Sequence, residues 1–130
     1  MDWQSETDNL LATKKVSGVT FLVIDTGSIY AQSGKPSLSS SEALNFTMYL
    51  HDGLISPSIV LAGKEYTLSK YNKDLNIAYM DCDNGGLCVG MTSLVIVIGF
   101  WSKDFGENFN SLQCNQAVEN QLKSYIEDGI

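Results

Sequence analysis

Asp25 is the residue whose type and surroundings could most readily perform acid–base chemistry. It follows an apolar run at residues 21–24 and precedes Thr26 and Gly27. Two carboxylates that share one proton can act as the general acid and base of a hydrolytic reaction. The sequence holds one such turn, so this chemistry would require two copies of the chain. Aspartate, threonine and glycine are also common in ordinary hairpin turns, which is the competing interpretation.

Other catalytic and metal-binding patterns are weak in this sequence. Residues 81–85 begin like a calcium loop, but its twelfth position is Thr92, where the ion needs a bidentate glutamate. Cys82 and Cys88 flank a turn and could face each other across two strands, but two thiols alone do not make a zinc site. The sequence specifies neither a nucleophile nor an orienting partner for His51. We therefore expect no catalytic residue, no metal and no cofactor.

Three aromatic residues indicate a binding function instead. Trp3 lies near the N-terminus, Tyr30 on an expected second strand and Tyr125 near the C-terminus. If the two terminal helices pack side by side, these rings form one exposed cluster. Aromatic grooves bind polyproline II segments, because proline rings stack on aryl faces and the ligand loses little entropy. The alternative is that the three rings are ordinary core residues.

The composition excludes several classes of partner. Of the 130 residues, 44% are hydrophobic and 18% are charged, so we expect one folded domain over residues 1–130. Eight basic residues oppose fifteen acidic ones, and the net charge of −7 argues against nucleic acid and anionic membranes as partners. The N-terminus lacks a signal-peptide pattern, no apolar run is long enough for a membrane span, and the three cysteines are too sparse for a disulfide scaffold. We therefore expect a cytoplasmic protein.

Periodicity and turn signals predict the elements that must position these residues. Apolar spacing and capping signals predict helices at residues 2–12, 43–50 and 111–128. Runs rich in β-forming residues predict strands at 19–24, 28–33, 58–61, 66–71, 75–80, 87–91 and 94–100. Short hairpin connections favour an antiparallel sheet. The fold class is therefore α+β, with helices packed on a central sheet of about six or seven strands.

Two of these elements make predictions for individual side chains. The strand at 75–80 should present three residues on one face: Leu75, Ile77 and Tyr79. The C-terminal helix should bury an apolar stripe: Cys114, Val118, Leu122, Tyr125 and Ile126.

Nearly the whole chain resembles the profilin family. In the first half the similar segments are Trp3-Gln4 with 8–11 (family W-Q-x-Y-V-D-x-x-L), 25–33 (D-G-S-V-W-A-Q-S, with one extra residue here) and 61–66 (L-G-G-x-K-Y). In the second half they are Gly85-Gly86 with 94–99 (G-G-I-x-I-x-K-T, then L-V-I-G) and a C-terminal match at Cys114-Asn115, Val118-Glu119, Ile126 and Gly129. The order and spacing of these motifs together carry the resemblance.

The resemblance implies a monomeric, non-enzymatic and cytoskeleton-associated protein that binds monomeric actin and regulates its polymerisation. It implies terminal helices packed together on one face of the sheet and a short helix on the other. It implies a groove for proline-rich peptides lined by Trp3, Tyr30 and Tyr125. It also implies an actin-facing surface that includes Lys64, Leu68, Lys70 and Asn115.

The chain departs from the family pattern at both sites. Glu6 and Ser124 stand where the family has groove tyrosines, and Tyr30 stands where it has a tryptophan. Asp81 and Cys82 replace a basic run before the glycine pair. We therefore expect a divergent member with weak or altered proline binding, weak actin binding and little phosphoinositide binding.

Two alternatives stay open at the level of sequence. The turn at Asp25 is similar to the catalytic turn of retropepsin-like aspartic proteases, so a homodimeric protease is one of them. The other is a protein with the profilin fold that has lost actin and serves a different partner.

Overall fold

The computed structural model of the chain describes residues 1–51 and 57–130. The elements follow one another in this order: α1 (Trp3–Ala12), β1 (Gly18–Val23), β2 (Ile29–Gly34), α2 (Ser40–His51), β3 (Ser58–Leu61), β4 (Lys64–Asn72), β5 (Ile77–Cys82), β6 (Gly85–Met91), β7 (Val95–Ser102) and α3 (Ser111–Glu127). The predicted order of helices and strands is confirmed.

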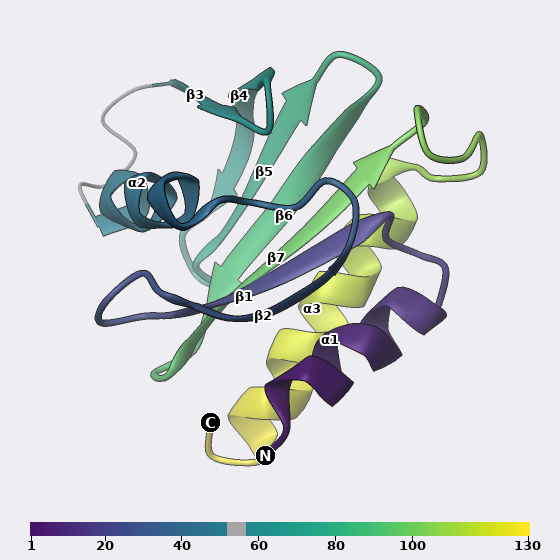
Figure 1. The fold of residues 1–130 in the computed structure, drawn as a ribbon. Coiled ribbons are helices and arrows are strands. Elements are labelled where there is room, and N and C mark those ends of the chain that lie inside the picture. The colour runs from purple at the N-terminus through teal and green to yellow at the C-terminus, as the bar shows by residue number, and fades with distance from the viewer. Residues whose placement is uncertain (52–56) are drawn as a thin grey trace.

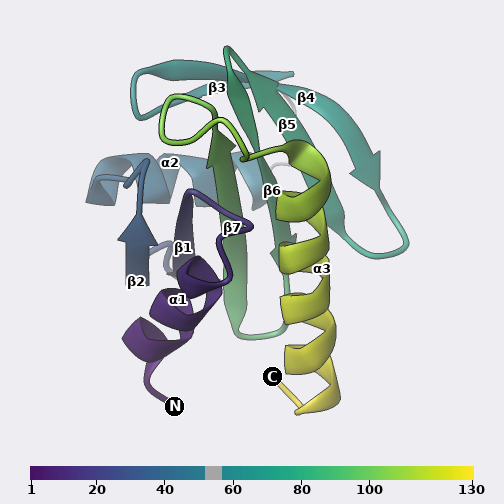
Figure 2. The same cartoon turned by 90° about the vertical axis from the view of Figure 1, so that its right-hand side faces the viewer.

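In the described part of the chain, seven strands form one sheet in the order β2-β1-β7-β6-β5-β4-β3, and every neighbouring pair is antiparallel. Helices α1 and α3 lie on one face of this sheet and α2 lies on the other, as Figures 1 and 2 show from two directions. The predicted α+β class and the placement of the helices are confirmed. The two terminal helices therefore share a face, as a binding site built from both ends of the chain requires.

The sheet separates two hydrophobic cores, because its central strands bury side chains on both faces. The core under α1 and α3 contains Phe21 from β1, Cys88 from β6 and Val118 from α3. The core under α2 contains Phe46 of that helix and Phe100 of β7. The continuous apolar run in β7 is explained by this double burial, since alternate residues enter different cores.

Each helix begins at a side-chain cap, which fixes where it starts. The carboxylate of Asp2 accepts hydrogen bonds from the backbone N–H groups of Gln4 and Ser5 at the start of α1. At α2, the N–H of Glu42 donates to the hydroxyl of Ser39, and the N–H of Ser39 donates to the Glu42 carboxylate. This is the capping box that the sequence predicts. Both caps satisfy N–H groups that the helix itself leaves without partners.

Helix α3 lies close to the sheet because glycine occupies the strand positions beneath it. A Cβ atom at Gly99 of β7 would lie 2.5 Å from a methyl carbon of Val118. A Cβ atom at Gly90 of β6 would collide with Leu122, one turn further along α3. These two positions hold the C-terminal helix in the place where it can meet α1.

Two strands begin two residues earlier than the sequence predicts, because the preceding turns are tighter than expected. Ala62 and Gly63 both have positive φ, which closes a two-residue hairpin turn and lets β4 begin at Lys64 rather than residue 66. The β5–β6 turn likewise holds two residues, with Asn84 at positive φ, so β6 begins at Gly85 rather than residue 87. Pairing therefore continues up to each turn.

Three predictions for individual side chains are wrong. Leu75 lies in the β4–β5 turn and is 60% exposed, since β5 begins only at Ile77. Ile126 is 61% exposed, and Ala117 instead completes the buried stripe of α3. Cys82 and Cys88 do not face each other: Cys88 lies opposite Tyr79, and Cys82 packs against the other core. Five residues lie between the two cysteines, and the two-residue turn between the strands puts them on opposite faces.

Candidate functional site

Four aromatic rings from four elements meet where α1 and α3 cover the sheet. The rings of Trp3 and Tyr30 stack, with centroids 4.7 Å apart and an interplanar angle of 23°. Tyr125 meets Trp3 edge-on, at 5.9 Å and 81°. Phe21 lies edge-on to both Trp3 and Tyr125. The structure thus brings together the three residues predicted for the proline groove, and we call these four residues the ring cluster.

Hydrogen bonds between α1 and β2 fix the position of Trp3. The side-chain amide of Gln4 donates to the carbonyl of Gln32 and to the hydroxyl of Ser33. Ser33 in turn donates to Asp8, one turn further along α1. The hydroxyl of Ser5 donates to Asp2, and this bond lowers the pKa of the Asp2 carboxyl. The first turn of α1 is therefore held on β2, directly above Tyr30.

Only part of the ring cluster is open to a ligand. Trp3 and Tyr30 are half-buried, whereas Phe21 is fully buried and Tyr125 is 2% exposed. The expectation of three exposed rings is thus corrected for Tyr125, which lies in the stripe of α3 that packs on the sheet. Ser124, the next residue on α3, is exposed beside it. The available aryl surface belongs to Trp3 and Tyr30.

Glu6 joins the two terminal helices across this surface. The hydroxyl of Tyr125 donates a hydrogen bond of 2.9 Å to Oε1 of Glu6, which lies one turn after Trp3 on α1. Burial raises the pKa of Tyr125, and the bond to Glu6 raises it further. Tyr125 therefore stays protonated and donates to the Glu6 carboxylate.

A second surface lies between α3 and the strands β4, β5 and β7, around a hollow of about 340 Å³. Its lining includes Lys70 and Asn115, which are two of the four predicted actin-facing residues. The hydroxyl of Tyr79 donates a 2.6 Å hydrogen bond to Oε1 of Glu119, which ties β5 to α3. The Lys70 ammonium lies 5.9 Å from the centre of the Tyr79 ring. We call this surface the α3 hollow.

The other two predicted residues lie elsewhere. A β-bulge between Leu68 and Lys70 reverses the side-chain alternation of β4, so Leu68 packs against the core under α2. The Lys64 ammonium lies 2.6 Å from a carboxylate oxygen of Asp104, and the hydrogen bond between them raises the pKa of Lys64. It also donates to the carbonyl of Asp83. Lys64 and Leu68 are therefore not part of the α3 hollow.

Sequence reasoning predicted Asn115 but missed other residues of the α3 hollow, among them Leu112 and Glu119. Leu112, Asn115 and Glu119 all line it, and their spacing of three and four residues puts them on one side of α3. Leu112 is 66% exposed and lines the hollow together with the half-buried Trp101. The spacing of Leu112 and Glu119 around Asn115 could have predicted that all three share one side of the helix. We used the periodicity of this helix only to find its buried apolar stripe.

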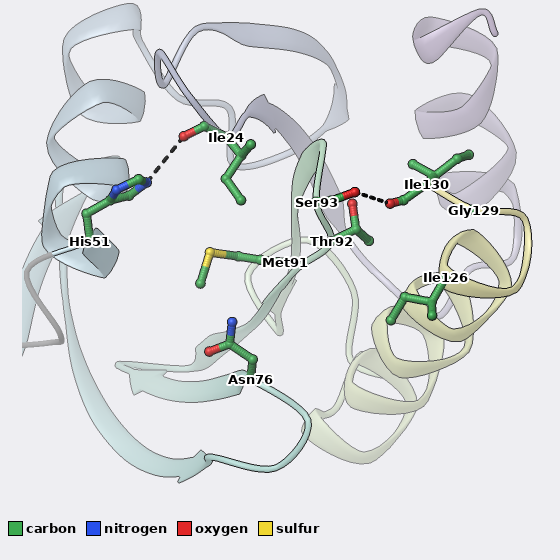
Figure 3. Close-up of a pocket in the computed structure, with 9 residues that line it drawn as sticks. All are labelled: Ile24, His51, Asn76, Met91, Thr92, Ser93, Ile126, Gly129 and Ile130. Carbon is green, nitrogen blue, oxygen red and sulfur yellow. Dashed lines mark hydrogen bonds between the residues drawn. The ribbon is translucent and has the colours of Figure 1, made fainter.

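A larger hollow of about 700 Å³ lies at the other end of the molecule, and Figure 3 shows the residues that line it. Its polar groups are already bonded within the protein. Nε2 of His51 donates to the carbonyl of Ile24, and the hydroxyl of Ser93 donates to the carbonyl of Ile130 (Figure 3). The amide oxygen of Asn76 accepts from Tyr71. These bonds join neighbouring elements, so we do not assign a ligand to this hollow.

Asp25 lies exposed in the turn between β1 and β2, which is an ordinary hairpin turn. The N–H of Gly27, at φ +74°, donates to the carbonyl of Val23, and the N–H of Val23 donates to the carbonyl of Ser28. Among residues 1–51 and 57–130, no group of three or more His, Cys, Asp or Glu could hold a metal ion. Within the same ranges, no helix is long and apolar enough to cross a membrane.

Taken together, the fold and its two surfaces define a small α+β domain that presents aromatic and mixed polar surfaces to other molecules. The family model for profilin matches residues 1–130. The chain therefore belongs to the profilin family. This membership accounts for the Asp-Thr-Gly segment as a hairpin turn, and we do not retain the protease alternative.

Solved structures of profilins share the fold at low sequence identity. Acanthamoeba castellanii profilin II matches with a TM-score of 0.82 and 21% identity, over 98% of this chain and 99% of that one. Mouse profilin IIa, in complex with a double repeat from the FH1 domain of mDia1, matches at 0.73 and 14%, over the whole of both chains. LokiProfilin2, in complex with rabbit actin, matches at 0.66 and 13%, over 92% of each. A search of curated protein sequences found no significant match.

Proposed function

We propose that this protein binds monomeric actin and regulates its polymerisation, and that it does so through the α3 hollow. The observation that carries the proposal is the juxtaposition of Lys70 and Asn115 beside an exposed apolar residue, Leu112, and a half-buried Trp101. A polar rim around exposed apolar and aromatic side chains is the composition of a protein-binding surface. Membership of the profilin family and the actin complex of LokiProfilin2 support the choice of partner.

We further propose that actin binding is weak, because this surface carries little positive charge. Among the described residues that line the α3 hollow, Lys70 is the one cation, whereas Asp81 and Glu119 are acidic. The resemblance implies basic residues where Asp81 and Cys82 stand. A surface with fewer cations associates more slowly with an oppositely charged partner. Salt screens this attraction, so the difference in association rate becomes small at high salt.

The test is an actin polymerisation assay with Lys70→Gln and a matched control, Lys64→Gln. We expect wild-type protein to slow polymerisation at concentrations on the order of tens of micromolar, which corresponds to a weak complex. Lys70→Gln should weaken this effect by about two- to fivefold, as for the loss of one exposed charge pair. Lys64→Gln should change little, because its ammonium is already bonded to Asp104.

An absence of any effect of the wild-type protein in this range would refute the actin proposal. It would favour the remaining alternative, a profilin-fold protein that serves another partner. Equal losses for the two lysine variants would instead refute the α3 hollow as the binding surface.

The ring cluster favours a second proposed activity, the weak binding of proline-rich peptides. Its support is the stacked pair Trp3 and Tyr30, which offers an aryl surface between the terminal helices. Tyr125 contributes mainly by holding Trp3 in place, since it is buried. The FH1 complex of mouse profilin IIa supports the class of ligand. Tryptophan fluorescence during titration with polyproline should change in a saturable way and should lose that change in Trp3→Ala.

A working model of the protein's setting follows from these proposals. We infer that it acts as a monomer in the cytoplasm, associated with the cytoskeleton, and that phosphoinositides are not among its partners. The support is family membership together with a net charge of −7.

A further inference from the structure

The open aryl surface of the ring cluster is bordered by carboxylates. Glu6 lies one turn after Trp3 on α1 and is half-buried. Its Oε1 accepts from Tyr125, whereas Oε2 has no hydrogen-bond partner in the described part of the chain. One oxygen is thus held in place by the protein, and the other is left for a donor from outside.

The ionisable side chains of α1 and of its cap are all acidic. Helix α1 contains Glu6 and Asp8 and no lysine or arginine, and its cap is Asp2. The start of α1 and the end of α3 lie at the same end of the molecule, where α3 ends with Glu127 and Asp128 (Figures 1 and 2). The N-terminal ammonium lies near Asp2 and offsets part of this charge, and the start of the chain beside the exposed rings is still net negative.

The nearest lysine in α3 lies on the far side of that helix. Glu119 is bonded to Tyr79 of β5, so its side of α3 faces away from α1. Lys123 follows one helical turn later and lies on the same side as Glu119. It therefore does not neutralise Glu6, whose partner Tyr125 points to α1.

We propose that the groove selects proline-rich segments that carry an arginine or lysine beside the proline run. This inference rests on the proposed proline-binding activity and specifies its ligand. The prolines stack on Trp3 and Tyr30, and the cationic side chain pairs with the free oxygen of Glu6. With Glu6 at the position where the resemblance implies a tyrosine, the groove has one stacking contact fewer and gains selectivity for a cationic ligand.

The test compares three peptides of ten prolines with blocked ends, flanked on both sides by Arg, by Gln or by Glu. Flanking both sides makes the result independent of peptide direction. Affinity for the full-length protein is measured from tryptophan fluorescence at low salt and again at about 0.5 M salt, where screening is strong. We expect the Arg peptide to bind about two- to fivefold more tightly than the Gln peptide at low salt, and the Glu peptide to bind most weakly. The difference should largely disappear at high salt.

Glu6→Gln is the decisive variant, because glutamine keeps an oxygen that accepts the Tyr125 hydrogen bond and removes the charge. It should bind the Gln peptide as wild type does and should lose the preference for Arg. Glu65 is an exposed residue of β4, away from the groove. Glu65→Gln makes the same charge change there and should keep the preference for Arg.

The outcomes separate this inference from the proposal beneath it. Saturable binding with equal affinity for the Arg and Gln peptides, or an Arg preference that persists in Glu6→Gln, would overturn the charge selectivity alone. Failure of all three peptides to bind would overturn the proline-binding activity and this inference with it.

Discussion

At the scale of single residues, the bond between Tyr125 and Glu6 joins the two terminal helices beside the ring cluster. Tyr125 Oη donates to Glu6, while the ring itself packs edge-on against Trp3 and Phe21. The polar and aromatic contributions of Tyr125 can therefore be separated by substitution.

Tyr125→Phe should lower the free energy of unfolding by about 0.5–1.5 kcal/mol, because it removes one hydrogen bond and keeps the ring. The value should fall near the lower end, since the half-exposed Glu6 can bond to water instead. Tyr125→Ala should cost about 3–5 kcal/mol, because it also leaves a cavity among the rings. Urea denaturation of both variants measures the difference, and equal losses would contradict the assignment of most of the energy to the ring.

The residue scale also marks the limit of prediction from sequence. The meeting of Trp3, Tyr30 and Tyr125 could be predicted, because the terminal helices were expected to share a face. The apolar stripe of α3 predicted the burial of Tyr125, but the edge of the stripe could not be predicted. Ile126 was expected in the stripe and is exposed, because neighbouring helix residues point about 100° apart and only the packed structure fixes the rotation of α3. The split of Lys64 and Leu68 from Lys70 follows from a bulge that no residue type in β4 signals.

At the scale of elements, the contact between α3 and the sheet positions both proposed surfaces. One side of this helix forms the α3 hollow, and the other meets α1 through Tyr125. Its close approach depends on glycine in the strands beneath it, at Gly90 and Gly99. The sequence predicted the helix and the strands, but the need for glycine at these two positions becomes visible only when α3 lies across them.

Gly99→Ala should lower the free energy of unfolding by about 1–3 kcal/mol, because the new methyl group would overlap Val118. Val118→Ala removes the methyl carbon that would be overlapped. In that background Gly99→Ala should cost clearly less, and the double-mutant cycle measures the coupling. Additive losses would show that the strand glycine is not what sets the approach of α3.

At the scale of the whole molecule, the net charge of −7 predicts how the protein behaves at an anionic membrane. It should not pellet with vesicles that contain phosphoinositides at physiological salt. Each basic residue near an anionic surface contributes about 1 kcal/mol of attraction, and this chain has an excess of acidic residues. A double variant, Asp81→Lys with Asp83→Lys, raises the net charge by four units at exposed positions and should move part of the protein into the pellet. Firm pelleting of the wild type would contradict the prediction.

Burial of thiols and phenols also makes the stability of the whole fold depend on alkaline pH. Burial raises the pKa of Cys114 to about 12, and it raises the pKa values of Cys88, Tyr66 and Tyr79. In the unfolded chain thiols titrate near 8.5 and phenols near 10. Above about pH 8.5 the unfolded chain therefore loses protons that the folded chain keeps, and raising the pH favours unfolding.

The free energy of unfolding should therefore have its full value below about pH 8.5 and should decrease as the pH rises toward 12. A single buried thiol contributes at most about 1.4 kcal/mol per pH unit to this decline. Cys114→Ala has a lower stability at neutral pH because it leaves a cavity, so the quantity to compare is the slope between pH 8.5 and 10. That slope should be smaller in Cys114→Ala than in wild type when both are measured by urea denaturation under reducing conditions. An unchanged slope would mean that the Cys114 thiol ionises as readily in the folded chain as in the unfolded one, which its position between α3 and the sheet opposes.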